Sequence, residues 1–380
     1  MEMEEKLKLY LRSMISNNGS DLHLKSGAIT RIRIEGVLKL LGKEPLSSEE
    51  IDGIVREITT KDQYMRLQED RNLDFTYILS DDYRFRVNVF YQMEGLSAVF
   101  RIIPVKILNI DELKLPKVIH EFTKIQRGLV LVTGVTGSGK STTLAAIIDK
   151  INRENKKHII TIEDPIEFVH KDRGCLINQR AIGQDTHSFS DALRAALRED
   201  PDIILVGEMR DLETIDIALH AANTGHLVFS TLHTLDAKET IDRIIGMFAK
   251  EEQNRIRASL ASVLEGVISQ RLIPTVQGTR TAAIEILKKT ARIEQLIREN
   301  RDYEIPDAIF EGKDIYGTQT FDQALLDLIR DGRINDEIAL EYASNPADMK
   351  LKLEGVGRGA IVKDEVKDIK EDIFEFKEED

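Results

Sequence analysis

Cysteine and tryptophan are almost absent from this chain, which has one cysteine, Cys175, and no tryptophan in 380 residues. A single cysteine excludes an internal disulfide and a zinc site built from several cysteines, and it fits a reducing cytoplasm. No stretch approaches the roughly 18–20 uninterrupted apolar residues of a membrane span. The first residues, Met1–Glu5, are acidic and no apolar run follows them. We therefore expect a cytoplasmic protein with no signal peptide and no membrane span.

Basic residues are outnumbered by acidic ones, 53 to 66, which gives a net charge of −13. This imbalance argues against a general nucleic-acid-binding surface, although a local basic channel in an oligomer stays compatible with it. The apolar share of 42% is that of a globular protein. The length of 380 residues predicts two or three domains rather than a single core.

The most informative feature that is present is a complete phosphate-binding loop, Gly-Val-Thr-Gly-Ser-Gly-Lys-Ser, at Gly134–Ser141. An apolar run at Leu129–Thr133 precedes it and a run that can form a helix, Thr142–Ile148, follows it, and this strand–loop–helix context supports the motif. Its backbone N–H groups and the helix N-terminus can face an anion. Lys140 can reach the β- and γ-phosphates of a nucleotide, and the Ser141 hydroxyl can hold Mg²⁺. The expected nucleotide contacts are Gly134, Thr136, Gly137, Ser138, Gly139, Lys140, Ser141 and Thr142.

The order of apolar runs predicts an α/β protein with two domains. Residues 1–103 are predicted to form a small α/β domain, and residues 104–127 a linker with a short helix. Residues 128–358 are predicted to form a mostly parallel sheet covered by helices on both faces, largely helical beyond Thr279. Residues 359–380 are expected to be an acidic, mobile tail. The predicted parallel strands are Leu129–Thr133, His158–Ile162, Ile203–Val206 and Leu227–Thr231.

Acidic side chains follow two of these strands. Glu208 comes after Ile203–Val206, where a carboxylate would lie beside the phosphate loop and polarise a water or hold Mg²⁺ through one. Glu163 and Asp164 follow the earlier strand, and two acidic sites near one phosphate loop suit magnesium and water chemistry. A strand followed by a surface acid, or a capped turn, would give the same local pattern.

Histidines and arginines are further candidates. His233 follows the strand Leu227–Thr231 and could sense the γ-phosphate, or it could be satisfied locally, whereas His226 precedes that strand and should lie at its opposite end. Arginine can stabilise charge on a transferring phosphoryl group, in cis or in trans. Alternating arginines on a strand can equally form a solvated face. The first-domain candidates are Arg84, Arg86 and Arg101.

Four segments resemble motifs that occur in the same order in the ATPases of type II secretion and type IV pili. In chain order they are the loop Gly134–Thr142, the acidic box His158–Phe168, the segment Ala192–Asp211 and the histidine box Gly225–Thr234. The resemblance implies a PAS-like N-terminal domain, a RecA-like P-loop motor domain, and a hexameric ring that binds ATP and Mg²⁺ between the domains. By matched position it implies phosphate and Mg²⁺ contacts for Lys140 and Ser141, catalytic roles for Glu163 and Glu208, the histidine box for His226 and His233, and site arginines at Arg84, Arg86 and Arg101.

Within the family, this sequence resembles the pilus-retraction branch. Assembly and secretion members usually carry a longer N-terminal extension and a four-cysteine metal module, and this chain has neither. One segment departs from the retraction pattern Ala-Ile-Arg-Asn-Leu-Ile. The matching stretch is Arg292–Ile297, in which Glu294 replaces an arginine and Gln295 an asparagine, so the coupling of hydrolysis to a partner can differ here.

The resulting expectation is a cytoplasmic homohexameric ATPase that powers pilus retraction. Its expected partner is a platform protein of the inner membrane, at whose cytoplasmic face it would act, with no nucleic acid involved. Three alternatives stay open at this point: an assembly or type II secretion motor, a RecA-like motor on nucleic acid, and a nucleotide sensor without turnover. A nucleic-acid motor predicts basic loops interleaved with aromatic residues, and the chain offers no such run.

Overall fold

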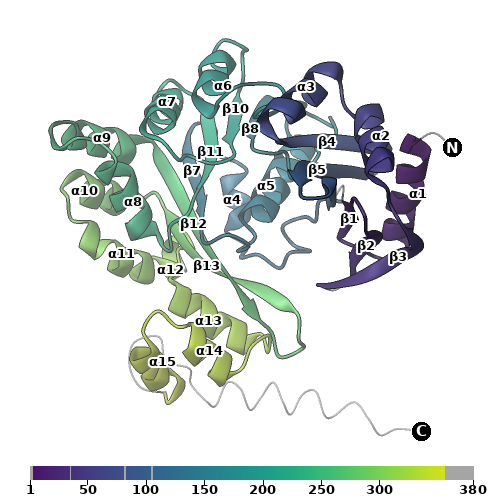
Figure 1. Ribbon diagram of the computed structural model, residues 1–380. Coiled ribbons are helices and arrows are strands. Elements are labelled where there is room, and N and C mark those ends of the chain that lie inside the picture. Colours follow the sequence, from purple (N-terminus) through teal and green to yellow (C-terminus); the bar gives the residue numbers. More distant parts are fainter. Residues whose placement is uncertain (1–2, 35, 81–82, 104–105, 356–380) are drawn as a thin grey trace, which may run out of the picture. The chain divides into compact units, whose positions relative to one another are not determined.

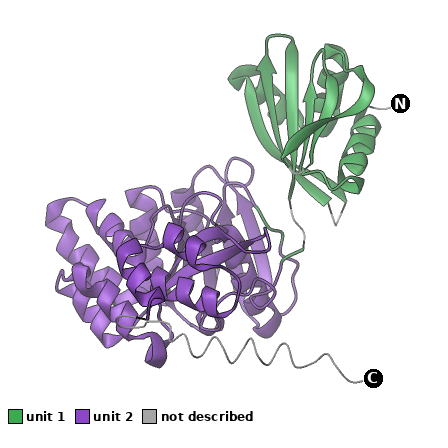
Figure 2. Cartoon of the chain, turned by 90° about the horizontal axis from the view of Figure 1, so that it is seen from below, with its two compact units in different colours: residues 1–107, 167–169 green, residues 108–166, 170–380 purple. Residues whose placement is uncertain are grey.

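The computed structural model describes residues 3–34, 36–80, 83–103 and 106–355 (Figure 1). The chain divides into two compact units, one made of residues 1–107 with 167–169 and the other of residues 108–166 with 170–380 (Figure 2). The predicted tail, 359–380, lies outside the described residues. No helix of the described part of the chain is long and apolar enough to cross a membrane.

The first unit is an antiparallel sheet of six strands with helices on one face. The strand order is β3-β2-β1-β6-β5-β4. Apolar side chains alternate along the strands, so one face packs against the helices and the other carries polar and charged residues. Helices α2 and α3 begin at capping boxes, in which Ser47 and Thr60 accept N–H bonds at the helix start. The elements are α1 (Met3–Ser16), β1 (Asp21–Lys25), β2 (Ile29–Ile34), β3 (Val37–Pro45), α2 (Ser48–Ile58), α3 (Lys61–Asp70), β4 (Asn72–Ser80), β5 (Tyr83–Gln92) and β6 (Gly95–Ile103).

The second unit is built on a sheet of seven strands in the order β13-β12-β7-β11-β10-β8-β9. All neighbouring pairs are parallel except β12 with β13. The central strands are buried on both faces, with α4 and α5 against one face and α6–α9 against the other (Figure 1). The elements are α4 (Ile119–Phe122), β7 (Gly128–Thr133), α5 (Lys140–Glu154), β8 (His158–Glu163), β9 (Leu176–Ala181), α6 (Phe189–Ala196), β10 (Ile203–Val206), α7 (Leu212–Asn223), β11 (Leu227–Leu232), α8 (Ala237–Gly246), α9 (Lys250–Val263), β12 (Leu264–Pro274) and β13 (Arg280–Lys288).

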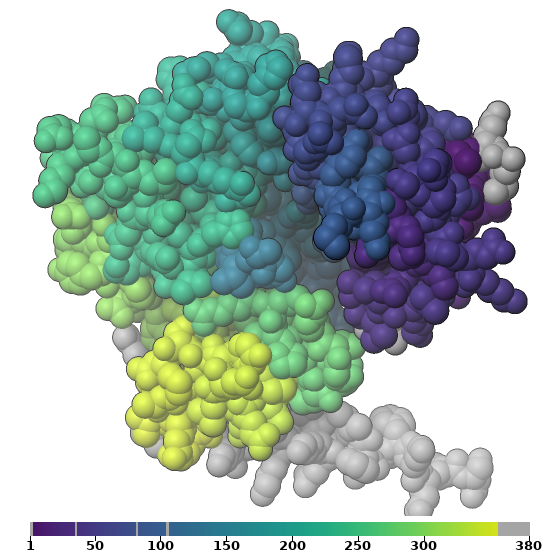
Figure 3. Space-filling model, viewed as in Figure 1, coloured from purple at the N-terminus to yellow at the C-terminus, as the bar shows by residue number. Residues whose placement is uncertain are grey.

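A helical part completes this unit. Its last helices, from Phe321 to Leu353, share a small core that packs on β12 and β13, whereas Ile293 and Ile305 of its first helices belong to the main core beside α8 and α9. Figure 3 shows the atoms of these last helices, coloured yellow, as a lobe at the bottom of the view. The elements are α10 (Ala291–Arg298), η1 (Asp302–Glu304), α11 (Ile305–Glu311), α12 (Lys313–Tyr316), α13 (Phe321–Arg330), α14 (Asp336–Tyr342) and α15 (Pro346–Leu353).

The predicted α/β class with a mostly parallel sheet is confirmed, but three strands were not predicted. These are β9, β12 and β13, and the expectation of largely helical structure beyond Thr279 is wrong for β13. The segment Arg280–Lys288 contains Ala, Glu, Leu and Lys, which favour helices in isolation. Pairing with β12 over nine residues overrides that propensity. Strand β12 follows α9 without an intervening loop, so no turn signal marks its start.

The predicted linker, 104–127, contributes to the core of the second unit. Ile119 and Phe122 of α4 are buried. The Phe122 ring lies against Gly266 of β12, where the register with β7 shifts, and a Cβ on Gly266 would overlap this ring. The absence of a side chain at Gly266 is therefore what lets α4 close over the sheet.

We expect Gly266→Ala to lower the free energy of unfolding by about 1–3 kcal/mol, because the added methyl group must displace the Phe122 ring. The matched control is Gly246→Ala at the end of α8, where a Cβ meets nothing within 4 Å. Denaturant unfolding of both variants measures the difference. Equal stability of the two variants would contradict the packing argument.

Candidate active site

The phosphate loop links β7 to α5 in a conformation that requires glycine. Gly134 and Gly139 have φ angles of 141° and 92°. A Cβ on Gly134 would overlap the Gln270 carbonyl oxygen and the Ser138 hydroxyl, so the loop lies directly against β12. The loop ends at the first turn of α5, a helix of 15 residues whose N-terminal N–H groups favour an anion.

Two buried groups of this loop suit a phosphate. The Lys140 ammonium lies over the loop, where it donates to the carbonyl oxygens of Gly134 at 2.8 Å and Val135 at 3.2 Å. The Ser138 hydroxyl is buried with no hydrogen-bond partner among the described residues. A buried polar group without a partner calls for an explanation such as a ligand. Thr136 and Gly137 are exposed at the tip of the loop, and Ser141 and Thr142 are half-buried in the first turn of α5.

Gln270 of β12 supports the loop and was not predicted from the sequence. Its side-chain amide donates to the Ser138 carbonyl at 2.8 Å and accepts from the Thr143 hydroxyl at 2.8 Å. Gln270 is 3% exposed, so both bonds are shielded from water. One side chain thus joins the loop, the first turn of α5 and β12.

The sheet order brings the other predicted residues to the same edge. Strands β7, β11, β10 and β8 are parallel neighbours. Their carboxyl ends lead into the phosphate loop, His233, Glu208 and Glu163, respectively. Ligands bind at the carboxyl edge of such a sheet, so the predicted positions agree with a site there.

Glu208 and His233 are in direct contact. The Glu208 carboxylate lies 3.2 Å from His233 Nε2 and 2.8 Å from Arg210 Nη2, and its side chain is 18% exposed. The backbone on either side is fixed, because Gly207 N donates to the Ile162 carbonyl and Met209 N to the Thr231 carbonyl. A cavity of about 100 Å³ lies beside these groups. Arg210 was not predicted as a site residue, although its position two residues after Glu208 could have indicated it.

Glu163 ends β8 and is held by its neighbours. Its Oε1 accepts from the Thr161 hydroxyl at 2.7 Å and from the Gln179 amide at 3.1 Å. Gln179 lies on β9, the strand that the sequence did not predict. Asp164 follows on the exposed surface. The Ser141 hydroxyl in the first turn of α5 and the carboxylates of Glu163 and Glu208 are oxygen groups of the kind that bind Mg²⁺.

His226 is separate from this edge, as its position before the strand predicts. Its Nδ1 lies 3.0 Å from the Ala221 carbonyl oxygen and 3.3 Å from the Thr224 hydroxyl. Its own carbonyl accepts from Gly128 N at the start of β7. His226 therefore joins the amino ends of β7 and β11, and the structure does not bring it together with His233.

The three candidate arginines share the helix-free face of the first unit. Arg84 and Arg86 alternate with buried residues along β5, and Arg86 pairs with Arg101 of β6 across the ladder. Arg101 Nε lies 2.7 Å from the buried Asp21 carboxylate. Burial alone would raise the pKa of Asp21, but hydrogen bonds from Ser20 and Arg101 outweigh it and lower that pKa. Arg86 Nε lies 3.8 Å from the Asp74 carboxylate.

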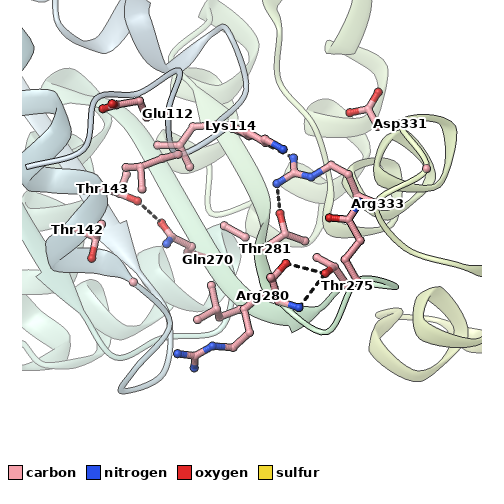
Figure 4. Close-up of a pocket in the computed structure, with 18 residues that line it drawn as sticks. Glu112, Lys114, Thr142, Thr143, Gln270, Thr275, Arg280, Thr281, Asp331 and Arg333 are labelled. Carbon is pink, nitrogen blue, oxygen red and sulfur yellow. Dashed lines mark hydrogen bonds between the residues drawn. The ribbon is translucent and has the colours of Figure 1, made fainter. Parts of the chain in front are cut away.

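A cavity of about 460 Å³ in the second unit begins at the phosphate loop. Gly139, Thr142 and Thr143 line one side, and Figure 4 shows Arg280, Arg333 and Lys114 around the rest. The Arg333 guanidinium is fixed by the Lys114 carbonyl at 3.3 Å and by the Thr281 hydroxyl. Burial lowers the pKa of Arg333. None of these three basic residues was predicted, because the chain segments that carry them meet only in the folded unit.

Comparison with known proteins identifies the family. The sequence profile of the family "Type II/IV secretion system protein" matches residues 2–367. The chain belongs to this family. It is 49% identical over 327 residues to the "Type IV pilus retractation ATPase PilT" of Pseudomonas aeruginosa, covering 86% of this chain and 95% of that protein. It is 47% identical over 321 residues to the "Twitching motility protein" of Neisseria gonorrhoeae, covering 84% and 86%, respectively.

A solved structure supports the same assignment. The crystal structure described as "the Pilus Retraction Motor PilT and Bound ADP" superposes with a TM-score of 0.84 at 43% identity, covering 90% of this chain and 98% of that one. The predicted RecA-like ATPase domain and N-terminal sheet domain are thereby confirmed. This member of the family is a nucleotide-binding ATPase, as the phosphate loop predicted.

Gln270 generates a prediction about nucleotide affinity. We expect Gln270→Leu to weaken ADP binding about 30-fold, because the loop loses two buried hydrogen bonds worth roughly 1 kcal/mol each. The matched control is Gln253→Leu on α9, whose amide donates to the Phe248 carbonyl away from the loop. Titration with a fluorescent ADP analogue measures both affinities. Unchanged affinity in Gln270→Leu would show that the loop holds its shape without this side chain.

Proposed function

We propose that this protein is a homohexameric motor that hydrolyses ATP with Mg²⁺ to power retraction of a type IV pilus. The observation that carries the proposal is the single sheet edge at which the phosphate loop, Glu208, His233 and Glu163 follow four adjacent parallel strands. The retraction role rests on the relatives, two of which are named for pilus retraction and twitching motility. An assembly or secretion motor is the alternative within the family.

The reaction is assigned to residues at that edge. Lys140 and the N–H groups of Gly134–Ser141 bind the phosphates, and the first-turn hydroxyl of Ser141 is placed to bind Mg²⁺. When bound, Mg²⁺ neutralises phosphate charge. Glu208 orients the attacking water and accepts its proton, and His233 contacts the same carboxylate, 3.2 Å away. Glu163, fixed by Thr161 and Gln179, would help to hold Mg²⁺ at this edge. The cavity beside Gly139 and Thr142 receives the base and ribose.

The motion is assigned to the two units. Arg84, Arg86 and Arg101 supply positive charge to the phosphates when the units close around ATP, and hydrolysis and release let them open. Closure that passes around a ring of six copies converts differential nucleotide affinity into movement. The partner is a platform protein of the inner membrane, reached from the cytoplasm.

Glu208 provides the decisive test of the reaction. We expect Glu208→Gln to lower steady-state ATP turnover at least about 100-fold, because the amide cannot accept the proton of the attacking water. ADP affinity should change less than about threefold, since no phosphate contact is lost. The measurement compares size-fractionated wild type and variant, and wild-type turnover should appear only in a fraction of hexamer size.

The controls separate the alternatives. Glu213→Gln on α7, whose exposed carboxylate pairs with Arg194, should turn over like the wild type. Added DNA should change no rate, and strong stimulation by DNA would instead indicate a nucleic-acid motor. In cells of the source organism, loss of the protein should leave more surface pili without twitching. Loss of pili would indicate an assembly motor instead.

Arg86 tests the role of the first unit. We expect Arg86→Ala to lower turnover at least about tenfold with little loss of stability, because an arginine at a transferring phosphoryl group is worth 10³ or more in rate, whereas its exposed pair with Asp74 contributes little to folding. The matched control is Arg56→Ala on α2, a helix packed on the opposite face of the sheet, where Arg56 pairs with Asp52. Turnover and melting temperature are measured on both. Wild-type turnover in Arg86→Ala would remove this arginine from the site.

A further inference from the structure

A buried carboxylate lies behind the loop that carries His233. Glu285 of β13 is 8% exposed, and its Oε1 accepts the backbone N–H of Ala237 at 2.8 Å. Ala237 is the first residue of α8. A carboxylate that meets an N–H group at a helix N-terminus makes a charge-assisted hydrogen bond and also interacts favourably with the helix dipole.

The loop His233–Asp236 joins β11 to α8 and is held mainly from the α8 side. The hydroxyls of Thr234 and Thr240 lie 2.6 Å apart, Leu235 N donates to the Glu239 carboxylate at 2.8 Å, and Glu239 N donates to Asp236 Oδ1 at 2.8 Å. These bonds stay within the loop and α8. The bond from Ala237 N to Glu285 ties this loop and helix start to the sheet.

His233 stands at the other end of the same short loop. Its Nε2 lies 3.2 Å from the Glu208 carboxylate. Three residues separate it from Ala237 in the sequence, so the position of the helix start limits where His233 can lie. The contact between Glu285 and Ala237 can therefore affect the position of His233 relative to Glu208.

The charged groups around Glu285 come from three elements. Asp236 precedes α8, Arg271 lies on β12 and Asp322 on α13, and the carboxyls of Asp236 and Asp322 disfavour a second negative charge. Arg271 directs its guanidinium over the Phe321 ring, 3.8 Å away, and to the Tyr342 carbonyl at 3.3 Å. Helix α11, which also packs on β13, contributes buried apolar side chains. Burial raises the pKa of Glu285 to about 7, although the bond from Ala237 and the charge of Arg271 oppose it.

We propose that Glu285 is a positioning residue for ATP hydrolysis: its carboxylate fixes the start of α8, and through the loop His233–Asp236 it holds His233 against Glu208. This inference rests on the proposed ATPase reaction and adds a residue to it from β13, the strand on which α13 packs. The same bond joins β13 to the start of α8.

The test compares turnover of the wild type and Glu285→Gln between pH 6 and pH 8.5. Glutamine imitates the protonated carboxyl, so the ratio of wild-type to variant kcat should be less than about twofold at pH 6 and rise to about fivefold at pH 8.5, since a charge-assisted bond is roughly twice as strong as a neutral one. The midpoint of the rise should lie near pH 7, where the carboxyl charges. The ratio removes the pH effects that the two proteins share. KM for ATP should be unchanged.

The proposal predicts opposite effects of Glu285→Gln on stability and on turnover. A purely structural role would lower both. The folded pKa of Glu285 is raised above its unfolded value, so the folded state binds more protons between those values and the contribution of Glu285 to stability falls as pH rises toward 7. Glu285→Gln should therefore melt higher than the wild type at pH 8.5 while turning over more slowly. A variant that is both slower and less stable at pH 8.5, or a kcat ratio independent of pH, would overturn the proposal.

Two further measurements keep the test decisive. Glu265→Gln on β12, whose carboxylate pairs with Lys289, is the matched control and should follow the wild type at every pH. Hydrogen exchange of wild-type peptides that contain Ala237, corrected for intrinsic rates, should show less protection at pH 6 than at pH 8.5. Unchanged protection would overturn the proposal even if Glu285→Gln failed to fold. Absence of turnover in the wild type would instead refute the proposed reaction.

Discussion

The site depends on the close approach of the phosphate loop to strand β12. At Gly134 the loop backbone lies against the Gln270 carbonyl oxygen with no room for a Cβ. This contact exists only because β12 runs parallel to β7 as its direct neighbour. It places the Gln270 amide where it can reach both Ser138 and Thr143. The shape of the loop is therefore fixed by a strand more than a hundred residues later in the sequence, before any phosphate is bound.

The parallel sheet also brings the candidate catalytic residues together at one edge. The inner residues of strands β7, β11, β10 and β8 are buried and mostly apolar. The charged candidates Glu163 and Glu208 therefore lie where strands end, and in parallel strands these ends share one edge. Glu208 and His233 meet there because β10 and β11 are paired in register from Ile203 and Leu227 onward. Residues that are distant in the sequence therefore meet at one edge of the sheet.

This geometry also explains what the sequence could and could not predict. The phosphate loop, Glu208 and His233 could be predicted from the sequence. Each follows closely after an apolar run that was itself recognisable as a strand. Gln270 and Glu285 were not predicted, since their roles depend on strands β12 and β13 and on partners 132 and 48 residues away. Segments rich in Ala, Glu and Lys look helical until their pairing partner is known. Local sequence patterns predicted the reactive residues. The residues that hold them in place depend on pairing between strands that are distant in the sequence.

The burial of Glu285 is the clearest conflict between stability and function in the structure. A carboxylate with a pKa raised to about 7 is disfavoured in its charged form, and an apolar or amide side chain would stabilise the fold at neutral pH. Buried acids with displaced pKa values gather at functional sites for this reason. Glu285 is bonded to the first residue of α8, and the same short loop ends at His233. Burying this charge lowers the stability of the fold. Its retention is explained if the carboxylate fixes the distance between His233 and Glu208.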